Sequence, residues 1–250
     1  MLYAGFAGAI VFGKVLCVHS HAPVIFSDIC VIRYGTGITE DPIMGGPRQS
    51  MINGPRQSTI TKRNDGTTVC PVLIFRIVNE KAKYKYGNIL NLSLDVVSVV
   101  VNETFHYNGS RMHRQFRNLN IQPESVPIFE DVLMIRHVLN ADSPLIDNET
   151  RKMIQSNNGR WPESYDSYEK IRDTLNFSEI NISVQGVSCI SKSTVYAQKV
   201  YALDEVKVGY KFIDMTYANK DSSKGPLVDL DMINYVKEQV GGGSEPLNLH

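Results

Sequence analysis

Hydrophobic and polar residues alternate along several parts of this chain, most clearly in the run 180–212. In its first half, Ile180, Ile182 and Val184 are separated by polar Asn and Ser residues. A period of two predicts a strand with one buried face. We expect Gly186 to interrupt this strand and a short serine-rich turn to follow it.

The same reasoning predicts strands along most of the chain. In the longest, 89–101, four apolar residues at every second position are expected to share one face: Leu90, Leu92, Leu94 and Val96. The other strands are expected at 24–26, 29–32, 69–78, 132–139, 194–203, 226–230 and from Val206 onward. Only 164–175 has a helical pattern outside the N-terminal region. Many strands, long polar connections and little helix together predict a mainly β fold of the β-sandwich type.

The N-terminal residues 2–18 are apolar except for Lys14. A helix that crosses a bilayer needs about 20 apolar residues, so this run is short for that role. Three interpretations are open: a secretory signal, a buried N-terminal helix, or the C-terminal part of a transmembrane helix that begins upstream. We favour the third for residues 1–18. Small residues give a face for close helix packing, and Lys14 lies where a cation can reach the membrane surface.

The rest of the chain divides into a folded part and two polar segments. We expect residues 19–240 to form the sandwich domain. Residues 35–68 are rich in Gly, Pro, Thr and Asn and contain GPRQS twice, so they predict a flexible insertion. Its sparse Lys and Arg residues leave phosphate binding as a less favoured alternative to a solvated loop. The glycine-rich end, 241–250, is expected to be a disordered tail.

Composition excludes several classes of partner. The formal net charge is +0, so no overall field attracts nucleic acid, and we expect no nucleic-acid partner. The four cysteines are widely spaced and form no CxxC pair, which gives no support to a zinc site and favours reduced thiols.

Six Asn-x-Ser/Thr sequons favour a secreted glycoprotein, although two of them lie within expected strands. They begin at Asn91, Asn102, Asn108, Asn148, Asn176 and Asn181.

No catalytic signature is present. The sequence lacks GxSxG, HExxH, P-loop and GxGxxG motifs, so we predict that the protein is not an enzyme and has no covalently bound cofactor. His19 and His21 are two residues apart without a third ligand nearby, which argues against a metal site. Lys81, Lys83 and Lys85 alternate with other residues. On an extended segment they would share one face, forming either an anion site or a lysine-protected strand edge.

Several motifs occur in an order and spacing similar to those of the inward-rectifier potassium channel family. The most specific is His137 followed by Asp-Ser-Pro-Leu at 142–145, and the segment 73–79 resembles the family's apolar–Arg–x–x–Asn strand. Further similarities are at 8–10, 24–27, 186–212 and 228–230. The resemblance covers most of residues 5–236, except 35–68 and parts of 105–125 and 155–175.

The resemblance implies an immunoglobulin-like β-sandwich preceded by a truncated transmembrane helix. It also implies a homo- or hetero-tetramer of like subunits around a potassium pore, in a multi-pass membrane protein whose sandwich domain is cytoplasmic. Potassium would be the permeant ion, and the selectivity filter and outer helix would lie upstream. The inner-helix gate would lie at Ala7 and Val11. The cytoplasmic gate loop would comprise Gly186, Val187, Ser188, Cys189, Ile190, Ser191 and Lys192. Small or apolar side chains at a constriction suit gating by dewetting, and Gly186 would let the loop bend.

The resemblance also implies partners for the charged residues. Phosphoinositide and other membrane lipid would be bound by Lys14, Lys81 and Lys83, although the sequence has fewer cations here than the family and Asn91 replaces one of them. His19 and His21 would strengthen this anion contact at acid pH. Strong rectifiers carry acids at three positions that here hold Tyr3, Gly87 and Gln185, so weak rectification is expected. The competing function is a secreted or cell-surface β-sandwich that acts as an adhesion or binding module; an enzyme on an all-β scaffold is the least supported.

Overall fold

The computed structural model is mainly β, and it describes a defined part of the chain. The described residues are 21–33, 36–37, 68–82, 84, 86–107, 109–162, 164–165, 167–217 and 227–238. The expected helix at 1–18, with Ala7, Val11 and Lys14, lies outside them, as do Lys83 and the tail 241–250.

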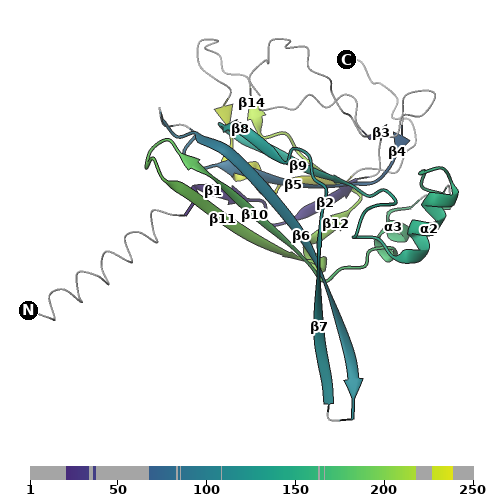
Figure 1. The fold of residues 1–250 in the computed structure, drawn as a ribbon. Coiled ribbons are helices and arrows are strands. Elements are labelled where there is room, and N and C mark those ends of the chain that lie inside the picture. The colour runs from purple at the N-terminus through teal and green to yellow at the C-terminus, as the bar shows by residue number, and fades with distance from the viewer. Residues whose placement is uncertain are drawn as a thin grey trace, which may run out of the picture.

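Two five-stranded sheets make up most of the described structure (Figure 1). The first has the order β1-β5-β2-β12, with β9 also paired to β5. Its strands are β1 (Val24–Phe26), β5 (Val72–Asn79), β2 (Cys30–Arg33), β12 (Val206–Val208) and β9 (Val132–Val138). Strand β12 runs parallel to β2, and the other pairs are antiparallel.

The second sheet is antiparallel, with the order β11-β10-β6-β7 and with β8 also paired to β6. Its strands are β11 (Thr194–Ala202), β10 (Glu179–Ser188), β6 (Ile89–His106), β7 (Gly109–Asn118) and β8 (Ser125–Phe129). The first half of β6 pairs with β8 and the second half with β7, so β6 continues beyond the sheet.

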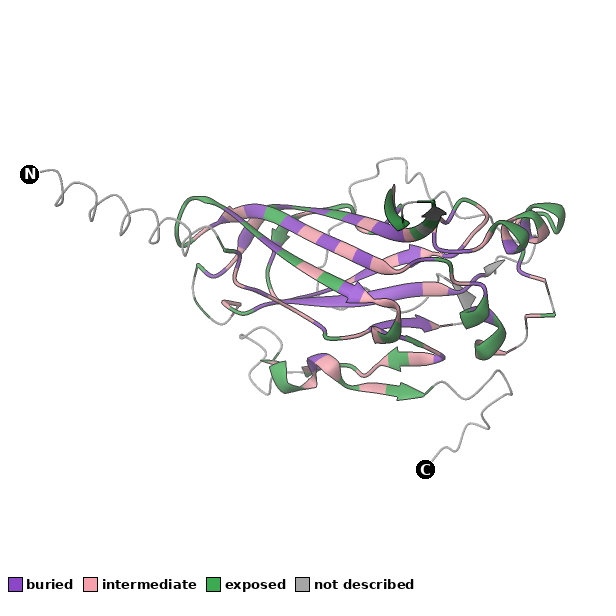
Figure 2. Cartoon of the chain, turned by 90° about the horizontal axis from the view of Figure 1, so that it is seen from below, coloured by how far each residue is buried: buried purple, intermediate pink, exposed green. Residues whose placement is uncertain are grey.

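The inner faces of the two sheets meet in one hydrophobic core. Phe75 and Ile135 from the first sheet, and Leu92 and Ile182 from the second, are each 0% exposed. Figure 2 shows the alternation of buried and exposed residues that this packing produces along the strands. Burying a side chain of this size contributes about 1.5–3 kcal/mol, so the alternating positions predicted from the sequence account for how the sheets pack.

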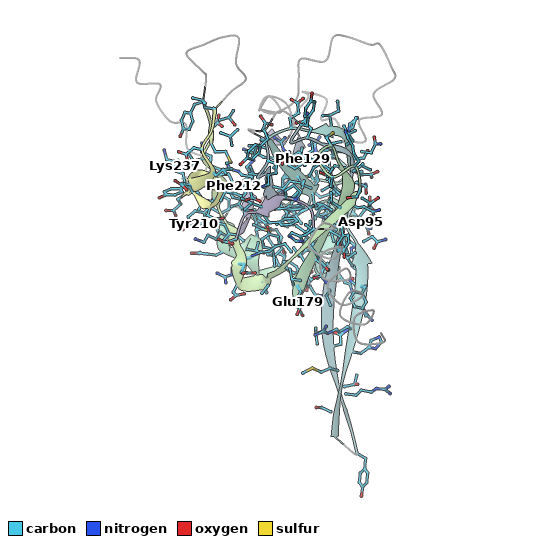
Figure 3. The ribbon with its side chains drawn as sticks, turned by 90° about the vertical axis from the view of Figure 1, so that its left-hand side faces the viewer. Asp95, Phe129, Glu179, Tyr210, Phe212 and Lys237 are labelled. Atoms are coloured by element: carbon cyan, nitrogen blue, oxygen red, sulfur yellow. The ribbon has the colours of Figure 1, made fainter. Side chains whose placement is uncertain are left out.

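A C-terminal segment covers the other face of the first sheet. It comprises β13 (Tyr210–Phe212), β14 (Thr216–Tyr217), β15 (Leu227–Val228), a 3-10 turn (Leu230–Asn234) and β16 (Val236–Glu238). Strand β13 pairs with β16 and β14 with β15. A small separate hydrophobic cluster joins this segment to the sheet: Val78, Val132, Met215 and Ile233. Figure 3 shows Tyr210, Phe212 and Lys237 together on this side, away from Asp95.

Two helices lie at one end of the sandwich, and the sequence pattern predicted only one of them. Helix α3 (Tyr168–Asp173) lies within the expected helix 164–175 and is shorter. Helix α2 (Asn148–Ser156) was not predicted. It begins after Asp147, whose side chain accepts a hydrogen bond from the backbone N–H of Thr150. Only Thr150 and Ile154 of this helix are buried, so it carries little hydrophobic periodicity.

The expected strands are confirmed at most positions, with two differences of physical interest. Strand β10 does not end at Gly186 but continues to Ser188, because Gly186 keeps its place in the ladder opposite Val195. The short strands β3 (Thr36–Gly37) and β4 (Thr68–Val69) pair, which joins the two ends of the expected insertion. The residues between them lie outside the described part.

Candidate functional site: an open sheet face and the turn beside it

The outer face of the second sheet is exposed to solvent and mostly polar. The register places Asp95 opposite Ser183, Ser183 opposite Gln198, and Ser93 opposite Gln185. We call this surface the open face. Its members are Ser93, Asp95 and Val97 of β6, Asn181, Ser183 and Gln185 of β10, and Tyr196, Gln198 and Val200 of β11. Hydroxyl and amide groups dominate it, so the surface is well hydrated without a strong field of its own.

Of the described members of the open face, only Asp95 carries a negative charge, and Glu179 begins β10 two residues before Asn181. Asp95 is exposed near the middle of β6, and Glu179 is half-buried at the start of β10. Figure 3 labels both on the same sheet. Sequence reasoning missed Asp95 as a site residue, although its alternation with Leu94 and Val96 was the signal that could have placed it here.

The expected gate loop is a tight hairpin turn at the end of the open face. Gly186, Val187 and Ser188 belong to β10, and the turn itself runs from Cys189 to Ser193. The Ser188 hydroxyl accepts the backbone N–H of Ile190 and of Ser191, each at 3.3 Å. The Ser188 backbone closes the turn by donating to Ser193 O at 3.0 Å and accepting from Lys192 at 2.9 Å. Ile190 projects from this turn with 55% of its surface exposed.

Gly186 serves close packing rather than a bend. It lies at a register shift between Gln185 and Val187, and an added Cβ would approach the Ile89 Cγ2 to 2.5 Å and the Leu90 carbonyl oxygen to 3.1 Å. Ile89 is fully buried. The turn is therefore held against the start of β6, as the hydrogen bond from Cys189 N to Asn88 O at 3.0 Å confirms.

The described part of the expected lysine segment 81–85 begins as a turn rather than as an extended strand. Hydrogen bonds run from Ala82 N to Asn79 O and from Tyr84 N to Lys81 O. Lys85 lies outside the described residues, so the shared face of the three lysines stays a prediction. Lys81 is half-buried with its ammonium 5.5 Å from the Tyr84 ring centre, and Lys83 lies outside the described residues.

Gly87 is not on the open face. It is buried inside the same series of turns, and a Cβ there would lie 1.7 Å from the Lys81 carbonyl oxygen. No side chain fits at this position with the present backbone. Three positions of this chain correspond to acidic positions of strong rectifiers. Of these, only Gln185 lies on the described open face, and Tyr3 lies outside the described residues.

The His137 and Asp-Ser-Pro-Leu motif forms a closed polar turn. The imidazole Nδ1 lies 2.7 Å from Asn120 O, so it donates there, and Nε2 accepts from the Ser143 hydroxyl at 2.8 Å. Trp161 Nε1 donates to Leu139 O at 2.6 Å and covers the turn. The motif is therefore a structural element that joins β9 to the helical end of the domain.

Acid should destabilise the domain through His137. Burial lowers the pKa of the imidazole, while the hydrogen bond to Asn120 opposes this effect. Because the pKa is lower in the folded state than in the unfolded state, the unfolded chain binds more protons and stability falls as pH drops below about 6.5. Urea unfolding at pH 7.5 and pH 5 should show this loss, and His137→Gln should reduce it. An equal pH dependence in both proteins would contradict the assignment.

The described cysteines are free, in keeping with the expectation of reduced thiols. Cys30 and Cys70 are buried and Cys189 is half-buried. Burial raises the pKa of Cys70 to about 11, and it raises that of Cys30 well above its usual value. Both thiols therefore stay protonated at neutral pH and are poor nucleophiles.

No three His, Cys, Asp or Glu residues within the described part of the chain come together as a metal site. None of the helices in this part of the chain has the length and apolar character to cross a membrane.

Comparison with known proteins does not assign the chain to a family. No family model matches the sequence, and no curated protein matches it at a significant level.

Proposed function

We propose that this chain is the pore-extending and gating domain of an inward-rectifier-type potassium channel, with an immunoglobulin-like sandwich in each of four like subunits. The main support for this proposal is the open face. A hydrated sheet surface of hydroxyl and amide groups, with an exposed carboxylate at Asp95, suits the wall of an aqueous passage for a cation. Potassium is the permeant ion in this proposal, and the residues that select it lie upstream.

The turn Cys189–Ser193 supports a gating role. It lies at the end of the open face and presents the exposed apolar side chain of Ile190. Four such side chains around an axis would form an apolar ring, which can close a pore by excluding water. The inner helix, with a second constriction at Ala7 and Val11, belongs to the same proposal, as does weak lipid-phosphate binding by Lys14, Lys81 and Lys83.

Potassium current through the complete reading frame that contains this chain tests the proposal. We expect weak block by spermine, because the open face carries few carboxylates. Gln185→Glu adds one carboxylate per subunit beside Ser93 and should raise spermine affinity about tenfold or more. Gln155→Glu, at an exposed position of helix α2, makes the same change away from the face and is the matched control. Absence of a potassium current from the complete protein would reject the channel.

A cell-surface binding module is the second candidate, and the exposure of the sequons favours it. The side chains of Asn91, Asn102, Asn148 and Asn176 are exposed. Asn91 and Asn102 are nevertheless within β6, where a glycan has little room beside neighbouring strands. Expression in a secretory host followed by endoglycosidase treatment distinguishes the two: a mobility shift of the native protein favours the surface module, and an unchanged mobility favours the channel domain.

A further inference from the structure

Strands β6 and β7 leave the body of the domain as a long two-stranded ribbon, which Figure 1 shows projecting beyond every other element. The pairing continues from Val101 opposite Arg114 to His106 opposite Gly109. Residues 109–116 of β7 are all exposed, so neither face of this strand packs on the rest of the chain. A two-stranded ribbon is marginally stable in water by itself, which indicates a surface that is completed by a partner.

The register gives the ribbon two different faces. Met112, Arg114 and Phe116 share one face, and Met112 and Phe116 expose 71% and 64% of their surfaces. The other face of β7 carries Arg111, His113, Gln115 and Arg117. Between residues 101 and 118 the sequence has three arginines and one acidic residue, so the ribbon is basic as well as apolar.

The part of the C-terminal segment around β14, β15 and the 3-10 turn presents a surface of opposite character, which we call the acidic patch. The exposed Lys211 and Lys237 lie on the separate strand pair β13–β16. Asp214, Asp229 and Asp231 are exposed there. The hydrogen bond from Asp229 N to Met215 O holds the aspartates close to one another. Tyr217 and Leu227 face each other across β14 and β15 with 48% and 56% exposure. Acidic and apolar groups therefore adjoin, as basic and apolar groups do on the ribbon.

The ribbon cannot reach the acidic patch of its own chain. In Figures 1 and 3 the ribbon projects from the opposite side of the body from β14. Complementary surfaces at opposite ends of one subunit pair head to tail between copies, and such contacts close into rings when the rotation allows.

We propose that the β6–β7 ribbon of one copy docks on the acidic patch of a second copy of this chain. The inference deepens the proposed function, because it names the contact that holds neighbouring subunits together. Arg114 faces carboxylates such as Asp231 in this contact, and Met112 and Phe116, on the same face of the ribbon, cover Tyr217 and Leu227. The apolar contacts supply affinity, and the charges set the direction of pairing.

Charge reversal tests the contact on the full chain purified in detergent, with sedimentation equilibrium as the readout. Arg114→Glu should raise the concentration at which the assembly dissociates at least ~10-fold, because like charges then meet. Asp231→Arg should weaken assembly in the same direction. Combining the two changes should restore most of the affinity. Arg160→Glu, an exposed arginine between the two helices, is the matched control and should assemble as the wild type does.

The circular dichroism spectrum and melting temperature should stay unchanged in these variants, since every altered side chain is exposed. Assembly that is insensitive to ribbon reversal, a combined variant no better than the single ones, or a chain that is monomeric at all concentrations would overturn the inference. The current measurement and the assembly measurement can give different answers, so the channel and the ribbon contact are tested separately. If assembly depends on the ribbon but no current is found, the contact is supported and the channel is rejected. If a current is found but assembly does not depend on the ribbon, the channel is supported and the contact is rejected.

Discussion

Replacing Arg76 by alanine should lower the free energy of unfolding by about 3 kcal/mol and loosen the C-terminal segment. Arg76 is fully buried in β5, on the face of the first sheet that the C-terminal segment covers. Its Nη2 donates to Ile213 O at 2.6 Å and its Nη1 to Met232 O at 3.2 Å. The guanidinium also lies 4.5 Å from the centre of the Phe212 ring. One side chain thus joins β13 and the 3-10 turn to the sheet.

The charge on Arg76 persists although its surroundings oppose it. Burial lowers the pKa of the guanidinium to about 10, and Asp214 partly offsets this effect. The group therefore stays protonated at neutral pH. Its Nε makes no hydrogen bond to any group that the structure describes. Alanine would leave the Ile213 carbonyl without its Arg76 donor and open a cavity, and each of these effects costs stability. The Met232 carbonyl would keep its second donor, the backbone N–H of Tyr235 at 3.2 Å.

Three measurements separate the roles of Arg76. Urea unfolding gives the total loss, and hydrogen exchange should show faster opening of β13 and β16 than of β10. Arg76→Met keeps the stem and removes the buried charge, so it should destabilise less than alanine does. Arg160→Ala is the exposed control, expected within about 0.5 kcal/mol of the wild type. A loss below about 1 kcal/mol for Arg76→Ala would show that the segment is held by its hydrophobic cluster alone.

The sheets were predictable from the sequence wherever one face of a strand is buried. Short apolar runs placed β1 at 24–26 and identified β9, and alternation identified β10, because their apolar residues meet one core. Strand β7 carries no such pattern, since its exposed part packs on nothing. Its extent depends on backbone pairing with β6, which composition does not reveal. Helix α2 was missed for a related reason, as only two of its residues are buried.

The candidate site was predictable in part. The turn Cys189–Ser193 was expected from the serine-rich sequence, and the described structure places it beside the open face. The roles of Gly87 and Arg76 were not predictable. Each depends on a contact that only the folded chain creates, with the Lys81 carbonyl in the first case and Ile213 and Met232 in the second. From the sequence alone, a single arginine in a strand is expected to be exposed.

Introducing valine at Gly186 should destabilise the protein by about 2 kcal/mol and displace the turn Cys189–Ser193. The new Cβ would overlap Ile89 Cγ2 at 2.5 Å, and because Ile89 is fully buried, any shift of its side chain disturbs the core around it. The Leu90 carbonyl oxygen at 3.1 Å limits movement in the other direction. In the proposed channel the same displacement alters the apolar ring at Ile190, so gating should change together with stability.

A double-mutant cycle identifies the cause of this effect. Ile89→Ala removes Cγ2 and by itself should cost about 2–5 kcal/mol, since it leaves a cavity. In the double variant the two losses should sum to clearly more than the measured loss, because valine at Gly186 then fills space that Ile89 vacated. Gln185→Val is the neighbouring control: it places the same side chain on the exposed face of β10 and should leave stability nearly unchanged. Strict additivity in urea unfolding would mean that Gly186 is required for a reason other than its contact with Ile89.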